Sequence, residues 1–334
     1  MKPFVSLAAA VVFGIATLSA QAADPIVIKF SHVVAPDTPK GKAAEKFKEL
    51  AEAKTNGAVK VEVYPNSTLY KDKEEMEALQ MGAVHMLAPS LAKFGPLGVK
   101  EFEAFDLPYI FRGYEDLHKI TKGEVGAGLL AKLEPKGVKG LAYWDNGFKV
   151  MSANKPLKMP EDYKGLKMRI QSSKVIEAQM RALSAIPQVM PFSETYQALQ
   201  TGVVDGTENP PSNLYTQKMH EVQKHVSLTN HGYLGYAVIA NKGFWDKLAP
   251  EVRTGLEEAL KESTDFANQI AKEENDKALE AVKASGKSEI YTPTEDETKA
   301  LQKALAPVHA EMSERIGKEL IESIYAATGF DPSK

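Results

Sequence analysis

The sequence lacks cysteine entirely and has no surplus of basic residues. Without cysteine the chain has no disulfide bonds, thiol nucleophiles or thiolate metal sites. Its 41 Lys and Arg residues are outnumbered by 44 Asp and Glu residues, which gives a formal net charge of −3. Because nucleic-acid-binding proteins normally carry a basic surface, we expect no nucleic-acid partner.

The sequence has only one long apolar run, and it lies at the amino terminus. Lys2 is followed by apolar residues 4–18 and then by Ala20-Gln21-Ala22. A positive start, an apolar middle and small residues at the end are the three parts of a secretory signal peptide. The run is shorter than the ~20 residues of a membrane-spanning helix, and no basic cluster follows it. We therefore predict that residues 1–22 are a signal peptide and that the mature chain is exported.

The sequence patterns of common catalytic sites are also missing. We find no GxSxG, HExxH, P-loop or GxGxxG pattern. Asp205 and Glu208 are candidates for an acid–base pair, but beside Gly206 a role as turn-stabilising caps is favoured. We therefore expect no catalytic residues and no enzyme activity. No histidines have the spacing of a close metal-binding pair, so we also expect no metal site and no cofactor; the histidines are His32, His85, His118, His220, His225, His231 and His309.

What the sequence does contain is a regular alternation of strand and helix patterns. Residues 26–34 are rich in β-branched residues, residues 40–55 have apolar positions at helical spacing, and residues 59–65 alternate like a strand. A second helix pattern and a third strand pattern follow within residues 71–90. This βαβαβ order predicts an α/β fold with largely parallel or mixed sheets flanked by helices.

The chain length and its helix-rich end indicate two lobes. A chain of 334 residues with 43% hydrophobic and 25% charged residues is long enough for about two domains. Residues 250–283 predict one long helix, which we expect to span both lobes, and residues 294–324 are helical as well. Because no Gly/Ser linker separates the halves, we expect strands to cross between the lobes and a ligand to bind in the cleft.

Arg169 stands near the end of a strand with one apolar face. In GLKMRIQSS (residues 165–173), Leu166, Met168 and Ile170 alternate with polar residues. A guanidinium presents donors in a planar fork that matches a carboxylate. The alternative is an outward-facing surface arginine, and the strand pattern alone does not decide between the two.

The segment VVDGTENPPSN (residues 203–213) predicts a strand that ends at Val204 and then turns. Gly206 permits an unusual backbone angle, and the Pro-Pro pair stiffens the exit. This arrangement would hold Asn209 in place, and its amide both donates and accepts hydrogen bonds. A purely structural turn is the alternative.

These two segments together resemble a known family. GLKMRI, followed by PFSETYQALQTGVVDGTENPP, is similar to the solute-binding component of tripartite ATP-independent periplasmic (TRAP) transporters. The resemblance extends from IKFSHVVAPDTPKGKAAEKF to GFWDKLAPEVR and is strongest with the C4-dicarboxylate-binding DctP type. It implies a periplasmic binding protein clamshell, with a long helix across both lobes, that closes on an organic acid such as malate, succinate or fumarate. It also implies a periplasmic location and integral-membrane partners, the small and large permease subunits.

The resemblance also assigns ligand-binding residues. The carboxylate-binding arginine of the family falls on Arg169, and its ligand-contacting asparagine falls on Asn209. A second basic contact, often arginine in sialic-acid binders, falls on Lys149. A lysine there offers a point charge in place of a planar fork.

The opposite side of the cleft supplies candidates by their position in the chain. His32 and Lys40 follow the first strand, and we expect them to bind the second carboxylate of the ligand. Ser90 and Lys93 follow the third strand, and Tyr236 lies near a crossing between the lobes. Because contacts from both lobes exist only when the cleft is closed, the ligand would favour the closed state.

The expected lobes are each built from two stretches of chain, and closure needs only a monomer. Residues 23–147 with 235–275 form lobe I, and residues 148–234 with 276–334 form lobe II. Each lobe therefore contains a segment that returns from later in the sequence.

Other functions stay open at this point. A sugar or amino-acid receptor of an ATP-driven transporter would stack aromatic rings on its ligand, but aromatic residues are only 8% and form no paired motif. An exported enzyme acting on organic acids would need an acid–base pair. The sequence does not separate a C4-dicarboxylate from a keto, aromatic or sugar acid, and it leaves room for an added role with a sensor kinase.

Overall fold

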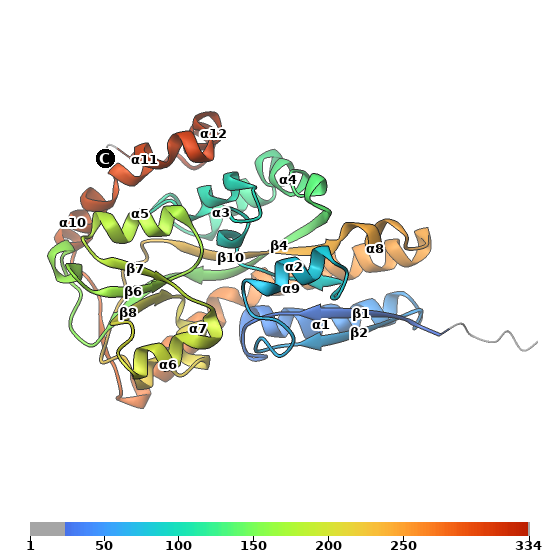
Figure 1. Ribbon diagram of the computed structural model, residues 1–334, viewed down its shortest axis with the longest axis horizontal. Coiled ribbons are helices and arrows are strands. Elements are labelled where there is room, and N and C mark those ends of the chain that lie inside the picture. The colour runs from blue at the N-terminus through green and yellow to red at the C-terminus, as the bar shows by residue number, and fades with distance from the viewer. Residues whose placement is uncertain (1–23, 333–334) are drawn as a thin grey trace, which may run out of the picture.

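The computed structural model describes residues 24–332 and folds them into two sheets with helices on their faces (Figure 1). The predicted signal peptide, residues 1–22, lies outside the described residues. The strands are β1 (Ile26–Ser31), β2 (Val59–Tyr64), β3 (Met86–Leu87), β4 (Val138–Phe148), β5 (Val150–Ala153), β6 (Lys167–Ile170), β7 (Ile186–Val189), β8 (Gly206–Asn209), β9 (His225–Ser227), β10 (Tyr233–Asn241) and β11 (Glu289–Tyr291). The α-helices are α1 (Pro39–Lys54), α2 (Glu74–Gln80), α3 (Tyr114–Thr121), α4 (Glu124–Ala131), α5 (Lys174–Ala182), α6 (Thr195–Gln200), α7 (Pro211–Thr216), α8 (Lys242–Asp246), α9 (Pro250–Ser285), α10 (Glu295–Leu305), α11 (Pro307–Ile316) and α12 (Lys318–Thr328). None of the helices in residues 24–332 is long and apolar enough to cross a membrane.

The first sheet has five strands in the order β2-β1-β3-β10-β4. β1 pairs in parallel with β2 and β3, as the βαβαβ pattern predicts. β10 returns from far along the chain and pairs antiparallel with both β3 and β4. Ile28 and Phe30 of β1 are fully buried against Phe47 of α1, because the alternating strand and the helical spacing both direct apolar side chains into this layer.

The second sheet has six strands in the order β11-β9-β5-β8-β6-β7. β6 is parallel to β7 and β8, whereas β5 is antiparallel to β8 and β9. Both sheets are therefore mixed, as predicted. Met168 and Ile170 of β6 pack in one buried cluster with Ile176 and Met180 of α5, which fixes β6 with its apolar face toward that helix.

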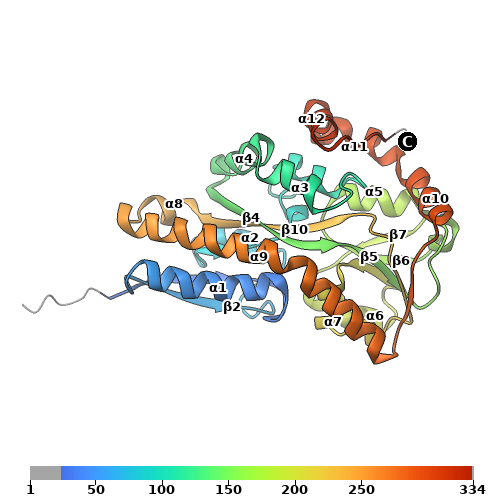
Figure 2. The same ribbon diagram turned by 180° about the vertical axis from the view of Figure 1, so that it is seen from behind.

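Three segments connect the two sheets. β4 continues into β5 through the single residue Lys149, and residues 228–232 bring the chain back from β9 to β10. The third connection is α9, which packs against α1 and β4 and also against α7 (Figure 2). The long helix predicted over residues 250–283 is thus confirmed, and it spans both lobes.

The carboxyl-terminal helices divide between the two sheets. α10 packs on α5 beside the second sheet, whereas α12 packs on α3, which lies beside the first sheet. His309 of α11 places its Nε2 atom 2.8 Å from the carbonyl oxygen of Pro108, which ties the same region to the first lobe. The boundaries of the two lobes stay a prediction. The expected division assigned residues 318–328 to lobe II, whereas these contacts place them against elements of lobe I.

Candidate ligand-binding site

A small cavity lies between the lobes, with about 300 Å³ of space unfilled by protein atoms. It is lined by Val33, Val34, Lys40, Asp72, Ser90, Lys93, Arg169, Gln171, Phe192, Asn209, Asn213, Leu234 and Tyr236. Six of the eight predicted site residues are among them. The folding of the chain thus brings together side chains from both sheets at the place where the sequence predicts a ligand.

Arg169 enters the cavity from β6 and is 2% exposed. Its Nε and Nη2 atoms both donate to the carbonyl oxygen of Met190, at 3.0 and 2.8 Å, and the guanidinium carbon lies 5.8 Å from the centre of the Phe192 ring. Burial lowers the pKa of Arg169, and the nearby carboxylates of Asp72 and Glu208 act against that change. Since arginine stays charged in proteins and has five N–H donors, the Met190 contact fixes the plane of the fork and leaves donors for an anion.

Lys40 enters from the opposite lobe, in the first turn of α1. The Thr38 hydroxyl accepts from the Gly41 N–H and caps the helix. A side chain at Gly41 would come within 2.4 Å of the carbonyl oxygen of Ala35, so only glycine allows this tight approach. The Nζ atom of Lys40 donates to the Ala88 carbonyl oxygen at 2.9 Å and lies 3.9 Å from the centre of the Tyr236 ring.

Lys93 is the third cation of the cavity, and two carboxylates already neutralise it. Its Nζ atom lies 2.5 Å from Asp72 Oδ1 and 2.6 Å from Glu75 Oε1. Although burial acts to raise the pKa of Asp72, the charges of Lys93 and Arg169 hold it down at about 2. Within residues 24–332, neither Lys40 nor Arg169 has a carboxylate oxygen within 4.0 Å. Two buried cations therefore remain without a carboxylate partner.

Two predicted residues do not line the cavity. His32 is 1% exposed, and burial together with the Lys40 charge lowers its pKa to about 3, so it is neutral and attracts no carboxylate. Lys149 is 2% exposed and forms a 3.0 Å ion pair with Glu208, whose other oxygen lies 3.2 Å from His231 Nε2. The Lys149 charge is thus compensated by Glu208, and Asp106 of the other lobe lies 3.9 Å away as a second carboxylate.

Asn209 lines the cavity, but its backbone setting differs from the expected turn. The strand does not end at Val204; β8 begins at Gly206, and Asn209 is its last residue. Gly206 is needed for close packing and not for an unusual backbone angle, since a Cβ atom there would lie 2.4 Å from the Ser152 carbonyl oxygen. The Asn209 Nδ2 atom donates to Thr207 Oγ1 at 3.3 Å, and this contact helps to hold the amide at the end of the strand.

The sequence reasoning missed several lining residues. Gln171 follows Arg169 by two positions, a spacing that places both on one face of an extended segment and was available in the sequence. Asn213 follows Asn209 by four positions, in the first turns of α7. Asp72 had no such signal, because it lies in the loop before α2, 97 positions from Arg169 along the chain.

The cavity opens toward the outside through a wider hollow of about 1660 Å³. Asp72, Lys93, Arg169 and Gln171 line both spaces, so these side chains form the boundary between cavity and mouth. The outer walls come from α2 on one lobe and from residues 189–191 on the other.

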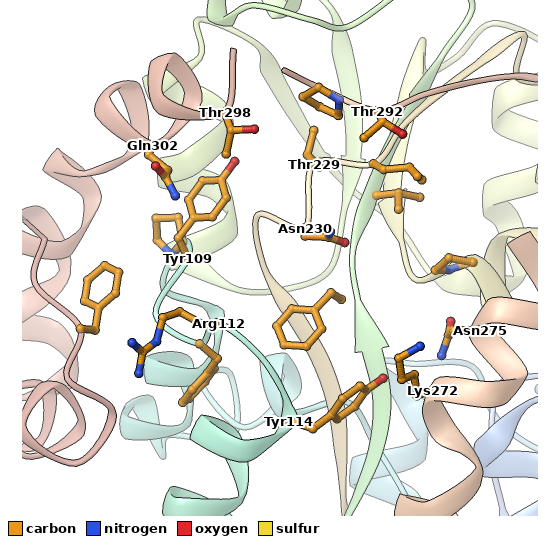
Figure 3. Close-up of a pocket in the computed structure, with 18 of the residues that line it drawn as sticks. Tyr109, Arg112, Tyr114, Thr229, Asn230, Lys272, Asn275, Thr292, Thr298 and Gln302 are labelled. Carbon is orange, nitrogen blue, oxygen red and sulfur yellow. The ribbon is translucent and has the colours of Figure 1, made fainter. Parts of the chain in front are cut away.

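A third and larger hollow, of about 2140 Å³, contains none of the predicted site residues. Figure 3 shows Tyr109 and Arg112 on one side of it, Lys272 and Asn275 of α9 on the other, and Tyr114 between them at the bottom of the view. Elsewhere in residues 24–332, three or more His, Asp or Glu side chains never come together in a group that could hold a metal ion. The small cavity is therefore the site that combines burial with unpaired cations.

A family model and a similar protein sequence both place this chain in one protein family. Residues 30–315 match the model of the family described as bacterial extracellular solute-binding protein, family 7. The chain is 72% identical over 306 residues to the C4-dicarboxylate-binding periplasmic protein DctP of Rhodobacter capsulatus, covering 92% of each chain.

Solved structures agree with this result. A TRAP periplasmic solute-binding protein from Shewanella oneidensis with bound succinate has a TM-score of 0.89 and 42% identity, covering 91% of this chain and 99% of that one. A TRAP periplasmic solute-binding protein from Pseudomonas aeruginosa with bound L-malate has a TM-score of 0.84 and 45% identity, covering 86% of this chain and 100% of that one. The protein therefore belongs to family 7 of the bacterial extracellular solute-binding proteins.

Proposed function

We propose that the protein is the periplasmic receptor of a TRAP transporter and binds a C4-dicarboxylate, namely malate, succinate or fumarate. It acts as a monomer without cofactor or catalysis and delivers the ligand to the small and large membrane subunits of the permease. The observation that carries the proposal is the pair of buried cations, Lys40 and Arg169, which line one cavity from opposite lobes without carboxylate partners.

The charge arrangement explains why a dicarboxylate would be selected. Each carboxylate of the ligand loses its hydration on burial and needs charge-assisted hydrogen bonds in return. Arg169 with Asn209 would bind one end, and Lys40 would bind the other. A monocarboxylate would leave one of these two cations buried without an anion.

Lobe closure follows from the same geometry. Arg169 and Asn209 belong to the second sheet, whereas Lys40 belongs to the helix that follows β1 of the first sheet. A ligand held at both ends therefore binds the closed arrangement more tightly than the open one, and this difference drives closure. The membrane subunits would then recognise the closed form.

The sequence relationships support the ligand class. A relative 72% identical over 92% of the chain carries the name of a C4-dicarboxylate binder, and structures more than 40% identical contain succinate or L-malate. The predicted periplasmic location agrees with the family description, which is that of extracellular proteins.

The first experiment is a ligand panel on mature protein freed of bound ligand by unfolding and refolding. Succinate, malate and fumarate are compared with butyrate, a matched monocarboxylate, and with galactonate and orotate. A ligand at a hundred times its Kd stabilises the folded state by about 2.7 kcal/mol, so the melting temperature is a sufficient readout. We expect shifts with the C4-dicarboxylates only. A shift with sugar or aromatic acids alone would replace the proposed ligand class, and a shift with neutral sugars alone would contradict organic-acid binding.

A further inference from the structure

A buried group of polar side chains lies between the small cavity and the larger hollow of Figure 3. At its centre is Asn146 of β4, which is fully buried. Its Nδ2 atom donates to Tyr236 Oη at 2.7 Å and to Asn213 Oδ1 at 3.1 Å, and both of these residues line the cavity. Tyr114 and Asn275, which line the larger hollow, contact Asn146 from the other side.

A backbone donor fixes the direction of the Asn275 amide, and the directions of the other amides in this group follow from it. The Ser212 N–H donates to Asn275 Oδ1 at 2.9 Å, and a backbone N–H can only donate. The Nδ2 atom of Asn275 therefore faces Asn146, and its two hydrogens are shared among the Ala271 carbonyl oxygen at 2.9 Å, the Asn146 carbonyl oxygen at 3.0 Å and Asn146 Oδ1 at 3.2 Å. The Ser212 hydroxyl also donates to Asn146 Oδ1, at 2.9 Å.

These hydrogen bonds leave Tyr236 and Asn213 with only donor groups available toward the cavity. Because Asn146 Oδ1 accepts twice on the α9 side, its Nδ2 group is directed to Tyr236 and Asn213. The oxygen atoms of Tyr236 and Asn213 are then occupied as acceptors. What remains is the O–H of Tyr236 and the NH₂ of Asn213, one N–H of which is directed to the Tyr236 oxygen. The O–H and the second N–H can donate to an anion.

If Tyr236 lost its proton, the phenol would become an acceptor and could no longer donate to an anion. The surroundings of Tyr236 prevent this ionisation. Burial raises the pKa of Tyr236 to about 12, while the hydrogen bonds from Asn146 and Asn213 act in the opposite direction. The phenol consequently keeps its proton at neutral pH. Lys40 above the ring adds a positive charge to the same wall of the cavity.

We propose that Asn146 is a positioning residue that orients Tyr236 and Asn213 as hydrogen-bond donors to the carboxylate ligand. This inference rests on the proposed function, since it assumes an anion in the cavity. Asn146 does not line the cavity itself. Its effect on affinity is therefore transmitted through the two residues that do.

The test is a double-mutant cycle on succinate binding, measured by titration calorimetry with Asn146→Asp and Tyr236→Phe. A carboxylate at position 146 accepts where the amide donates, so the Tyr236 hydroxyl turns toward it and away from the ligand. In the wild-type background Tyr236→Phe removes a hydrogen bond to a charged group, and affinity falls about tenfold or more. In the Asn146→Asp background the same change costs less than about twofold, because that bond is already lost.

A matched control separates this effect from an added negative charge. Asn241→Asp changes the other end of β10, outside the cavity lining, where Oδ1 accepts the Phe244 N–H at 2.8 Å and Nδ2 donates to the Leu79 carbonyl oxygen at 2.8 Å. As at position 146, the substitution replaces a donor with an acceptor and adds a negative charge. We expect its affinity for succinate to stay within about twofold of the wild type. An equal cost of Tyr236→Phe in the wild-type and Asn146→Asp backgrounds would overturn the assignment of Asn146.

The cycle remains informative if Asn146→Asp does not fold. Ser212→Ala removes one of the two donors to Asn146 Oδ1 and keeps the other. We then expect a smaller loss of affinity and a reduced effect of Tyr236→Phe; an undiminished effect would count against the positioning role. If the wild-type protein itself bound no C4-dicarboxylate, the proposed function would fail instead, which the same titration distinguishes.

Discussion

The Asp72 carboxylate accepts a 2.6 Å hydrogen bond from the backbone N–H of Phe192, a residue 120 positions away on the other lobe. The same side chain pairs with Lys93 at 2.5 Å within its own lobe. Asp72 also lines both the cavity and its mouth. One carboxylate thus joins the two lobes at the boundary between the cavity and its mouth.

Substitution of Asp72 should alter the rate of ligand release. Asp72→Asn keeps an oxygen that accepts the Phe192 N–H, whereas Asp72→Ala removes it. Because a hydrogen bond contributes about 0.5–1.5 kcal/mol, we expect release from Asp72→Ala to be about two to twelve times faster than from Asp72→Asn. Stopped-flow displacement of succinate measures both rates.

The exposed pair Lys71–Glu194 supplies the control for this comparison. It also crosses between the lobes, at 2.8 Å, but its side chains are 49% and 46% exposed. Exposed ion pairs are strongly screened by solvent, so Glu194→Gln should change the release rate by less than about fivefold. Equal release rates for Asp72→Asn and Asp72→Ala would contradict the role of the Phe192 contact.

Arg169→Ala should abolish measurable succinate binding. The change leaves one ligand carboxylate buried without its partner, a loss of about 3–5 kcal/mol. Arg169→Lys keeps the charge but not the planar fork, so we expect an intermediate loss. Calorimetry gives the affinities, and Arg181→Ala, which alters an arginine 47% exposed on α5, is the matched control. Wild-type affinity in Arg169→Ala would remove Arg169 from the site.

Lys40 should make binding depend on pH. Burial, followed by the charge of Lys93, lowers its pKa to about 7 in the ligand-free protein, and a bound carboxylate would raise it. Binding then takes up a proton above pH 7, so the affinity for succinate falls by up to about tenfold per pH unit as the pH rises. Calorimetry between pH 6.5 and 9 measures this slope. Lys40→Met should weaken binding and flatten the slope, whereas Lys46→Met on the same helix should preserve it.

The stability of the ligand-free protein should depend on the same group with the opposite sign. The folded pKa of Lys40 lies below its ordinary value of 10.5. Between about pH 7 and pH 10 the unfolded chain therefore holds a proton that the folded chain has released, and this group makes unfolding less favourable as pH rises. Urea unfolding of wild type and Lys40→Met across that range isolates the contribution, which should vanish in the variant.

Lys149→Ala should destabilise the fold and leave ligand selectivity unchanged. The substitution leaves Glu208, which is 1% exposed, without its lysine partner, and breaking such a pair costs about 3–5 kcal/mol. We expect a clearly lower melting temperature but a retained shift with succinate. Lys174→Ala, at a lysine 59% exposed, is the control. Lost binding at an unchanged melting temperature would instead make Lys149 a ligand contact.

The sequence was sufficient for the parts of the protein that depend on local patterns. Alternation in residues 59–65 and helical spacing in residues 40–55 led to β2 and α1, since each pattern directs apolar side chains to one face. The long charged segment became α9 because it contains no proline after Pro250, and it ends where Gly286 adopts a left-handed conformation. Arg169 and Asn209 were found from sequence patterns shared with a family, and both line the cavity.

Only the tertiary structure decided between residues of the same type. Lys40 and Lys149 are both buried lysines, but Lys149 lies 3.0 Å from Glu208 and Lys40 has a carbonyl oxygen and an aromatic ring as neighbours. The sequence does not predict this difference, because the neighbours of each lysine come from distant parts of the chain. Asp72 and Asn146 were missed for the same reason. A side chain's chemical type is set by the sequence, but its charge balance and the direction of its hydrogen bonds are set by neighbours distant along the chain.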